Sequence, residues 1–392
     1  MLSRHLPIAA LTLALAVALS VFAPIAQAGC YCTPDQCDIC DLCYTKIECC
    51  HDKPELWLVN TRCLPKCRGL DCGFERISIK RYDTETCCWV EETHESFLAH
   101  EAANPMPTLF FAHGNTLKHK GALEQMNLLQ CKFKCCPGKK RLVFWSWPAQ
   151  VVYKRPILRP REVISKNLKI KYVYAEYQGY YMAKFVQPMQ TSSRVTLGGH
   201  SYGGIIASVA AHYLGGGSLR CLTLEGSAPV QRPNLRLAIV SGAYDNDAMI
   251  PGMRYGQSFV AAEKVMNTRN CLDKTLKNWP DVSSRCRKAV GVTGINANLL
   301  GEHYNKLCQI TMTRDVGKSH YIEPHMKSSR LVNLMCCIAF PQCEQAACQS
   351  QSTLPDAATH EYDTCEEAES GAGPLLELAD QSIGSTVSSV SK

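Results

Sequence analysis

The 392-residue sequence contains no internal repeat, and no nucleic-acid-binding motif accompanies its net charge of +7. The first absence argues against solenoids and other repeat arrays, and the second leaves the positive charge without a nucleic-acid partner. Cysteine is absent from the first 29 residues, whereas all 24 cysteines lie in the remainder of the chain. The distribution of cysteine therefore separates a short N-terminal leader from a long, cysteine-rich remainder.

The first 28 residues are typical of a secretory signal. An uncharged run at 6–26 follows Arg4, and Ala26-Gln27-Ala28 offers small residues for cleavage before Gly29. An uncleaved membrane anchor is the alternative, because the run is nearly long enough to span a bilayer. Lipidation at Cys30 is a further alternative. We therefore expect an exported protein, located in the periplasm, outside the cell or on its surface.

An even number of cysteines in an exported chain predicts a disulfide framework. A bond between sequence neighbours is strained, so each member of a vicinal pair should bond elsewhere. Such pairs stand at 49–50, 87–88, 135–136 and 336–337. Cys37, Cys40 and Cys43 also have the spacing of metal ligands. Export favours disulfides over zinc or an iron–sulfur cluster at these three positions, so the sequence predicts no metal site.

Composition divides the mature chain into three parts. Its 364 residues (392 minus 28) suffice for one large core and an appendage. Residues 29–54 are dense in cysteine and poor in apolar periodicity, which predicts a cross-linked N-terminal segment. The core domain is expected at 55–348. Residues 349–392, with eight acids and one lysine, are predicted to be a disordered tail.

Apolar runs and helical patterns alternate through the core domain. This alternation of strands and helices is typical of an α/β protein with a mostly parallel central sheet flanked by helices. A helix is expected at 172–187, and strands are expected at 56–60, 77–82, 108–112, 142–147, 195–200, 220–224, 235–240 and 308–313.

The segment Gly199-His-Ser201-Tyr-Gly203 joins an apolar strand to a helix of small residues. A strand before and a helix after G-x-S-x-G indicate a nucleophile elbow, in which the serine occupies a strained turn. Gly199 and Gly203 leave room where a Cβ would collide with the neighbouring strand or helix. We predict that Ser201 is a catalytic nucleophile rather than part of an ordinary glycine-rich turn.

The loop after the strand at 235–240 carries two candidate acids. Asp247 is favoured because small and apolar residues follow it, and Asp245 is the alternative that could only cap the turn. His320 lies in the loop after the last strand, where it can swing over Ser201 as a base. Three other histidines lack this placement: His212, His303 and His325.

A second turn of interest follows the strand at 108–112. It reads His113-Gly114-Asn115, and a His-Gly turn at this place aims a backbone N–H at a substrate carbonyl oxygen. We predict that the backbone N–H groups of Asn115 and Tyr202 bind the oxyanion. His113 is interpreted as a residue that orders the turn rather than as a proton carrier.

Several segments together resemble a family of bacterial secreted α/β-hydrolases of unknown function. They extend over about 210 residues and stand at 111–116, 144–148, 199–203, 289–294 and 317–321. The resemblance implies an α/β-hydrolase fold and a triad of Ser201, Asp247 and His320, in the order nucleophile, acid, base. It does not imply a substrate.

The sequence therefore predicts a secreted serine hydrolase that cleaves carboxylic esters, lipid esters included, through an acyl-enzyme and without a cofactor. Two alternatives remain. One is a catalytically silent cell-surface interaction protein on a hydrolase scaffold, and the other is a Cys-rich protein that handles metals or thiols. Residues 118–171 carry 14 Lys or Arg but only two acids, Glu124 and Glu162. We expect these basic residues either to lie on solvated loops and helix faces or to attract an anionic polymer or a membrane surface.

Overall fold

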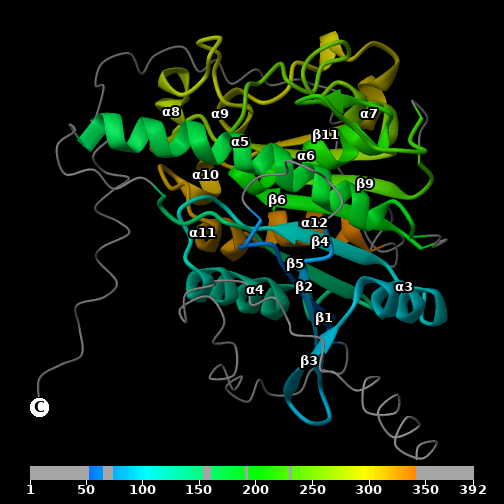
Figure 1. Ribbon diagram of the computed structural model, residues 1–392. Helices are drawn as coiled ribbons and strands as arrows, with labels where there is room; N and C mark the ends of the chain where they lie inside the picture. The colour runs from blue at the N-terminus through cyan, green and yellow to red at the C-terminus, as the bar shows by residue number, and fades with distance from the viewer. Residues whose placement is uncertain (1–52, 65–73, 153–159, 190–192, 229–231, 341–392) are drawn as a thin grey trace, which may run out of the picture.

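The computed structural model describes residues 53–64, 74–152, 160–189, 193–228 and 232–340. Within these ranges the chain forms a nine-stranded sheet in the order β11-β10-β9-β6-β4-β5-β1-β2-β3 (Figure 1). The predicted signal at 1–28, the three cysteines at 37, 40 and 43, and the predicted tail at 349–392 lie outside the described residues.

Seven strands of this sheet are parallel, and two antiparallel strands extend one edge. The parallel strands are β1 (Glu55–Asn60), β4 (Thr108–Ala112), β5 (Arg141–Ser146), β6 (Val195–His200), β9 (Leu235–Val240), β10 (Lys264–Arg269) and β11 (Leu307–Thr311). The antiparallel strands are β2 (Ser78–Asp83) and β3 (Cys88–Glu92). Loops that follow parallel strands meet at the carboxyl edge of the sheet, which is where ligands bind in open α/β sheets.

Helices cover both faces of the sheet (Figure 1). One face is packed by α3 (His94–Ala103), α5 (Pro160–Val186) and α6 (Tyr202–Leu214), and the other by α4 (His119–Phe133), α11 (Ile322–Lys327) and α12 (Ser329–Ala339). Shorter helices and 3-10 turns are α7 (Gln257–Ala261), α8 (Lys274–Lys277), α9 (Val290–Thr293), α10 (Thr313–Val316), η2 (Trp279–Asp281), η3 (Ala297–Leu299) and η4 (Gly301–Lys306). None of the helices in the described ranges is long and apolar enough to cross a lipid bilayer.

The alternation of side chains along β1 explains this two-sided core. Trp57 and Val59 belong to the cluster beneath α5 and α6, whereas Leu56 and Leu58 belong to the cluster beneath α4 and α12. Successive side chains of a strand point to opposite faces. A short continuous apolar run is therefore buried on both sides, as expected for a parallel strand.

Two parts of the sheet differ from the sequence prediction. The strand expected at 220–224 is instead a small hairpin of β7 (Ser218–Leu219) and β8 (Leu222–Thr223), outside the main sheet. Arg220 and Cys221 have φ angles of 54° and 60°, which belong to a turn and not to a strand. Two further strands, β3 and β10, are not among those expected from the sequence. In β10 the buried Asn267 and Thr268 interrupt the apolar run that would have indicated a buried strand.

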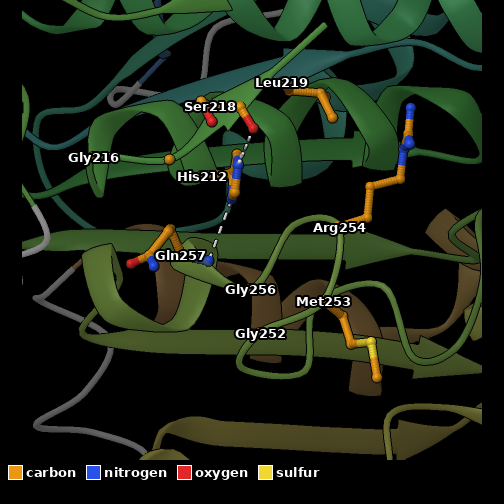
Figure 2. Close-up of a pocket in the computed structure, with 10 residues that line it drawn as sticks. His212, Gly216, Ser218, Leu219, Gly252, Met253, Arg254, Gly256 and Gln257 are labelled. Carbon is orange, nitrogen blue, oxygen red and sulfur yellow. Dashed lines mark hydrogen bonds between the residues drawn. The ribbon is translucent and has the colours of Figure 1, made fainter. Parts of the chain in front are cut away.

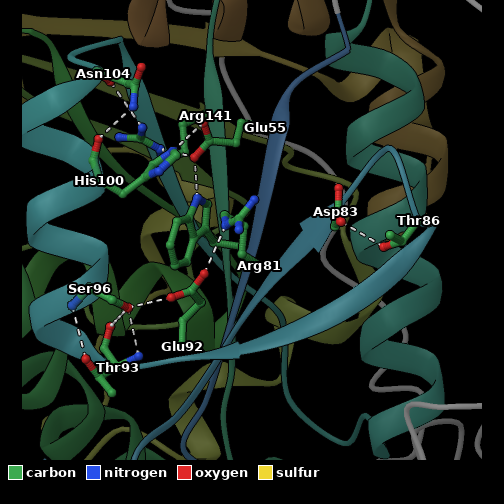
Figure 3. A network of polar contacts seen from close by, with 11 residues as sticks. Glu55, Arg81, Asp83, Thr86, Glu92, Thr93, Ser96, His100, Asn104 and Arg141 are labelled. Carbon is green, nitrogen blue, oxygen red and sulfur yellow. Dashed lines mark hydrogen bonds and ion pairs between the residues drawn. The ribbon is translucent and has the colours of Figure 1, made fainter.

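Ion pairs join α3 to the parallel sheet, and another joins the two antiparallel strands to each other (Figure 3). The carboxylate of Glu55 lies 2.7 Å from Arg141 Nε and 3.0 Å from His100 Nε2. On the antiparallel ribbon, Arg81 Nε lies 3.0 Å from the carboxylate of Glu92. Residues of β1, β5 and α3 thus share one charged cluster at this edge.

A disulfide between Cys136 and Cys336 joins the segment after α4 to α12. Each of these cysteines has a vicinal neighbour and bonds elsewhere, so the prediction from strain is confirmed for this pair. The bond closes a loop of 200 residues. The neighbouring Cys135 is an exposed free cysteine.

Replacing both bonded cysteines, Cys136→Ala with Cys336→Ala, should lower the free energy of unfolding by roughly 2–5 kcal/mol, because the unfolded chain gains freedom when a long loop is released. Urea unfolding of the oxidised protein measures this loss. Cys135→Ala is the matched control and should leave the urea midpoint unchanged. Equal midpoints for the double variant and the control would mean that the disulfide does not stabilise the fold.

Candidate active site

Ser201 occupies a strained turn between β6 and α6, with φ 56° and ψ −117°. A Cβ added to Gly203 would lie 2.0 Å from the carbonyl oxygen of Ala112 on β4. One added to Gly199 would lie 2.2 Å from the backbone of Gly203. Both distances are far below a van der Waals contact, so this close approach of β4, β6 and α6 requires glycine at both positions.

His320 reaches Ser201 from the loop that follows β11. Its Nε2 atom lies 2.9 Å from Ser201 Oγ, and its Nδ1 atom lies 2.7 Å from Asp273 Oδ2. The Asp273 side chain is fully buried, and its other oxygen accepts the N–H of Leu276 at 2.9 Å. A carboxylate that accepts from Nδ1 keeps the proton there and leaves Nε2 able to take the serine proton. These three side chains form one continuous hydrogen-bond chain.

The two acids predicted from the sequence make other contacts. Asp247 pairs with Arg285 Nη2 at 2.8 Å and with Arg287 Nε at 3.3 Å. Asp245 accepts a hydrogen bond from Trp279 Nε1 at 2.9 Å. Their carboxylates are therefore engaged away from the histidine.

The structure thus corrects the expected acid: Asp273 contacts His320, and neither Asp247 nor Asp245 does. The predicted acids follow β9, whereas Asp273 follows β10, the strand that the sequence analysis missed. Once β10 is recognised, an aspartate in the loop after a late strand is the signal that points to Asp273.

Asn270 is a second residue that sequence reasoning missed. It is fully buried, and its side-chain amide donates to the carbonyl oxygens of Gly317 at 2.8 Å and Ser319 at 3.3 Å. These bonds tie the loop that carries Asp273 to the loop that carries His320. The relative position of Asp273 and His320 is therefore held by hydrogen bonds from a buried side-chain amide to main-chain carbonyl oxygens.

His200 lies against His320, and His325 lies against His200. His200 Nε2 lies 2.7 Å from the His320 carbonyl oxygen, and because a carbonyl only accepts, His200 donates this bond. His325 Nε2 lies 2.8 Å from Ser241 Oγ, and its ring lies 6.1 Å from that of His200. Burial lowers the pKa of His200 well below 6.5, and the charges of His320 and His325 act in the same direction. Neutral His200 therefore holds the backbone of the loop that bears His320.

Folding stability should depend on pH through His200. The unfolded chain binds a proton at this residue near pH 6.5 and the native chain does not, so stability falls as the pH falls below 6.5. We expect His200→Gln to reduce the loss of unfolding free energy between about pH 7.5 and about pH 5.5 by about 1.4 kcal/mol. Urea unfolding of both proteins at the two pH values measures the difference. Parallel pH dependence in the two proteins would contradict a buried neutral histidine.

The His-Gly turn lies beside the elbow. A Cβ on Gly114 would lie 3.5 Å from Ser201 Cβ, and the buried His113 Nδ1 lies 2.7 Å from the Gly114 carbonyl oxygen. Within the described part of the chain, neither the Asn115 N–H nor the Tyr202 N–H has a hydrogen-bond acceptor. The latter is the first amide of α6 and has no intrahelical partner. Both amides predicted to bind an oxyanion are therefore available to a ligand.

His212 lies in the last turn of α6 and lines a hollow formed with residues 216–219, 252–254 and 256–257 (Figure 2). This end of the helix is roughly 18 Å from the Ser201 end, at 1.5 Å per residue. The Gln257 N–H donates to His212 Nδ1 at 3.3 Å, so Nε2 carries the proton and donates to the Ser218 carbonyl at 3.2 Å. Burial lowers the pKa of His212. This histidine is a neutral packing residue, remote from the elbow.

The mostly parallel sheet, the elbow after β6 and the histidine after the last strand define an α/β-hydrolase fold. No protein-family model matches the chain, and no curated protein matches it. Among solved structures, the chain is similar to acyl-protein thioesterase 2 from Zea mays at 11% identity. That match covers 60% of this chain and 94% of the thioesterase, with a TM-score of 0.33.

Proposed function

We propose that this protein is a serine hydrolase that cleaves carboxylic esters through an acyl-enzyme. The observation that carries the proposal is the hydrogen-bond chain from Ser201 Oγ to His320 Nε2 at 2.9 Å and from His320 Nδ1 to Asp273 Oδ2 at 2.7 Å. A serine hydroxyl is a weak nucleophile, and an adjacent base oriented by a buried acid is the arrangement that activates it.

In the proposed reaction, His320 accepts the Ser201 proton while Oγ attacks the ester carbonyl carbon. The resulting oxyanion accepts hydrogen bonds from the N–H groups of Asn115 and Tyr202, and each donor contributes roughly 3 kcal/mol of barrier lowering. His320 then protonates the departing alcohol. Water attacks the acyl-enzyme with His320 again as base, which releases the acid and restores Ser201. Asp273 orients the imidazole and stabilises the imidazolium throughout.

The surroundings of this chain support an ester with an apolar acyl or alkyl group. Leu272 precedes Asp273 and Tyr321 follows His320, and their exposed fractions are 36% and 49%. Val151 and Val152, in the loop after β5, are exposed by 41% and 51%. All four side chains stand on loops at the carboxyl edge of the sheet. Exposed apolar side chains on these loops would suit an apolar group of the substrate, because sites for small organic ligands are lined mainly by apolar side chains.

The location that we propose is an oxidising compartment outside the cytoplasm. The disulfide between Cys136 and Cys336 supports it, because such bonds persist where the environment is oxidising. The leader expected at residues 1–28 would provide the export signal.

Hydrolysis of a p-nitrophenyl ester series from acetate to palmitate, by protein produced in an oxidising compartment, tests the proposed reaction. We expect turnover of at least one ester, with an optimum in chain length that reports the size of the acyl site. A folded, disulfide-bonded protein that hydrolyses none of these esters, nor the corresponding thioesters, would contradict the proposal.

A further inference from the structure

Arg62 is a buried cation without an acidic partner. It follows β1, its exposed fraction is 4%, and no carboxylate in the described ranges pairs with it. Its guanidinium donates instead to neutral acceptors: Ser146 Oγ at 2.8 Å, and Leu117 O, Gln150 Oε1 and His113 Nε2, each at 3.1 Å. Burial lowers the pKa of Arg62 to about 9. An unpaired buried charge is expensive, so a role beyond packing is expected.

The contact with His113 determines the tautomer of that ring. Arg62 and the backbone N–H of Trp147 can only donate, and both point at His113 Nε2, at 3.1 Å and 3.2 Å. Nε2 is therefore unprotonated, and the proton resides on Nδ1. From Nδ1 it is donated to the Gly114 carbonyl oxygen at 2.7 Å. Burial and the charge of Arg62 lower the pKa of His113 well below 6.5, so the ring remains neutral.

This bond sets the direction of the next peptide. The peptide between Gly114 and Asn115 is planar and trans, so its C=O and N–H point in opposite directions. Because the Gly114 carbonyl faces His113, the Asn115 N–H faces away from it. The opposite tautomer would place the Nδ1 lone pair against the carbonyl oxygen, and the peptide would rotate to escape that repulsion.

We infer that Arg62 is a positioning residue of the oxyanion site, which acts through His113 to aim the Asn115 N–H at the reacting carbonyl oxygen. The inference rests on the proposed function, since it assigns a residue to the same reaction. Arg62 touches neither substrate nor Ser201. Misdirection of one backbone donor weakens the stabilisation of the transition state more than the binding of the ground state.

Replacing Arg62 with methionine removes the four donated bonds and keeps much of the side-chain volume. We expect Arg62→Met to lower kcat about 100-fold, as for a misplacement near 1 Å, with KM nearly unchanged. Affinity for an aryl boronic acid, whose bound hydroxyl imitates the oxyanion, should fall by a similar factor. Rates are normalised to sites titrated with a fluorophosphonate, so that unfolded molecules do not count. In Arg62→Ala, which leaves the space of the side chain empty, guanidinium ion at millimolar concentration should restore part of the lost kcat.

Arg236→Met is the matched control, because Arg236 is also buried but pairs with Glu263 at 3.2 Å on the distant end of β9. It should lower the melting temperature without changing kcat per titrated site. Arg62→Met with control-like kcat and boronate affinity per titrated site would overturn the inference alone. A folded wild-type protein that neither reacts with the fluorophosphonate nor cleaves any ester would overturn the proposed function, and the inference with it.

Discussion

Replacing Asp273 with asparagine should lower kcat about 10⁴-fold, because an amide can donate to His320 Nδ1 and so stabilise the wrong tautomer of the base. The wild-type geometry predicts this sensitivity, since the buried carboxylate lies 2.7 Å from Nδ1 and, among the described residues, accepts one other hydrogen bond, from the Leu276 N–H. Steady-state hydrolysis of the best p-nitrophenyl ester measures the loss, with KM expected to change little.

Asp247→Asn is the matched control for this substitution. Asp247 pairs with two exposed arginines, Arg285 and Arg287, so its loss should cost at most about 1 kcal/mol of stability and leave kcat near the wild-type value. The opposite ranking, with Asp247→Asn inactive and Asp273→Asn active, would restore the acid expected from the sequence and contradict the geometry.

Ser201→Ala should lower kcat on the order of 10⁶-fold, because the alanine side chain offers no nucleophile. His320→Ala should cost a similar factor, and the double variant should be no worse than either single variant, since the residues act as a unit. Stopped assays at high enzyme concentration, together with thermal unfolding of each variant, separate a chemical defect from a folding defect. Ester turnover that survives Ser201→Ala would assign the activity to another group.

Much of the fold is visible in the sequence because its strands carry continuous apolar runs. Phe110 and Phe111 on β4 are both fully buried, one toward each face, so the run itself predicts a strand covered on both sides. The elbow is equally visible, because only glycine at Gly199 and Gly203 allows the approach of β6, α6 and β4.

The acid could not be assigned from sequence because its assignment depends on counting strands. β10 buries Asn267 and Thr268, whose polar side chains conceal the strand. Without β10, β9 is the last predicted strand before the one that leads to the histidine loop, so the loop after β9, with Asp245 and Asp247, becomes the expected place of the acid. An error in one strand therefore displaced the predicted acid by 26 residues, from Asp247 to Asp273.

The polar groups that support the site also could not be identified from local sequence patterns. Arg62 and His113 are 51 residues apart in sequence and come together because β1 and β4 flank β5 in the sheet. Asn270 and Ser319 meet only because β10 and β11 are neighbours. Such pairs follow from the strand order, which local periodicity does not reveal.

Reaction of the mature, oxidised protein with a fluorophosphonate tests the central claim most directly. An activated serine forms a covalent phosphonyl ester with loss of fluoride, whereas ordinary serines do not react at a comparable rate. We predict one adduct per chain by intact mass, mapped to the peptide that contains Ser201, with labelling abolished in His320→Ala and strongly slowed in Asp273→Asn. An unlabelled native protein, or a label on any other residue, would contradict the account.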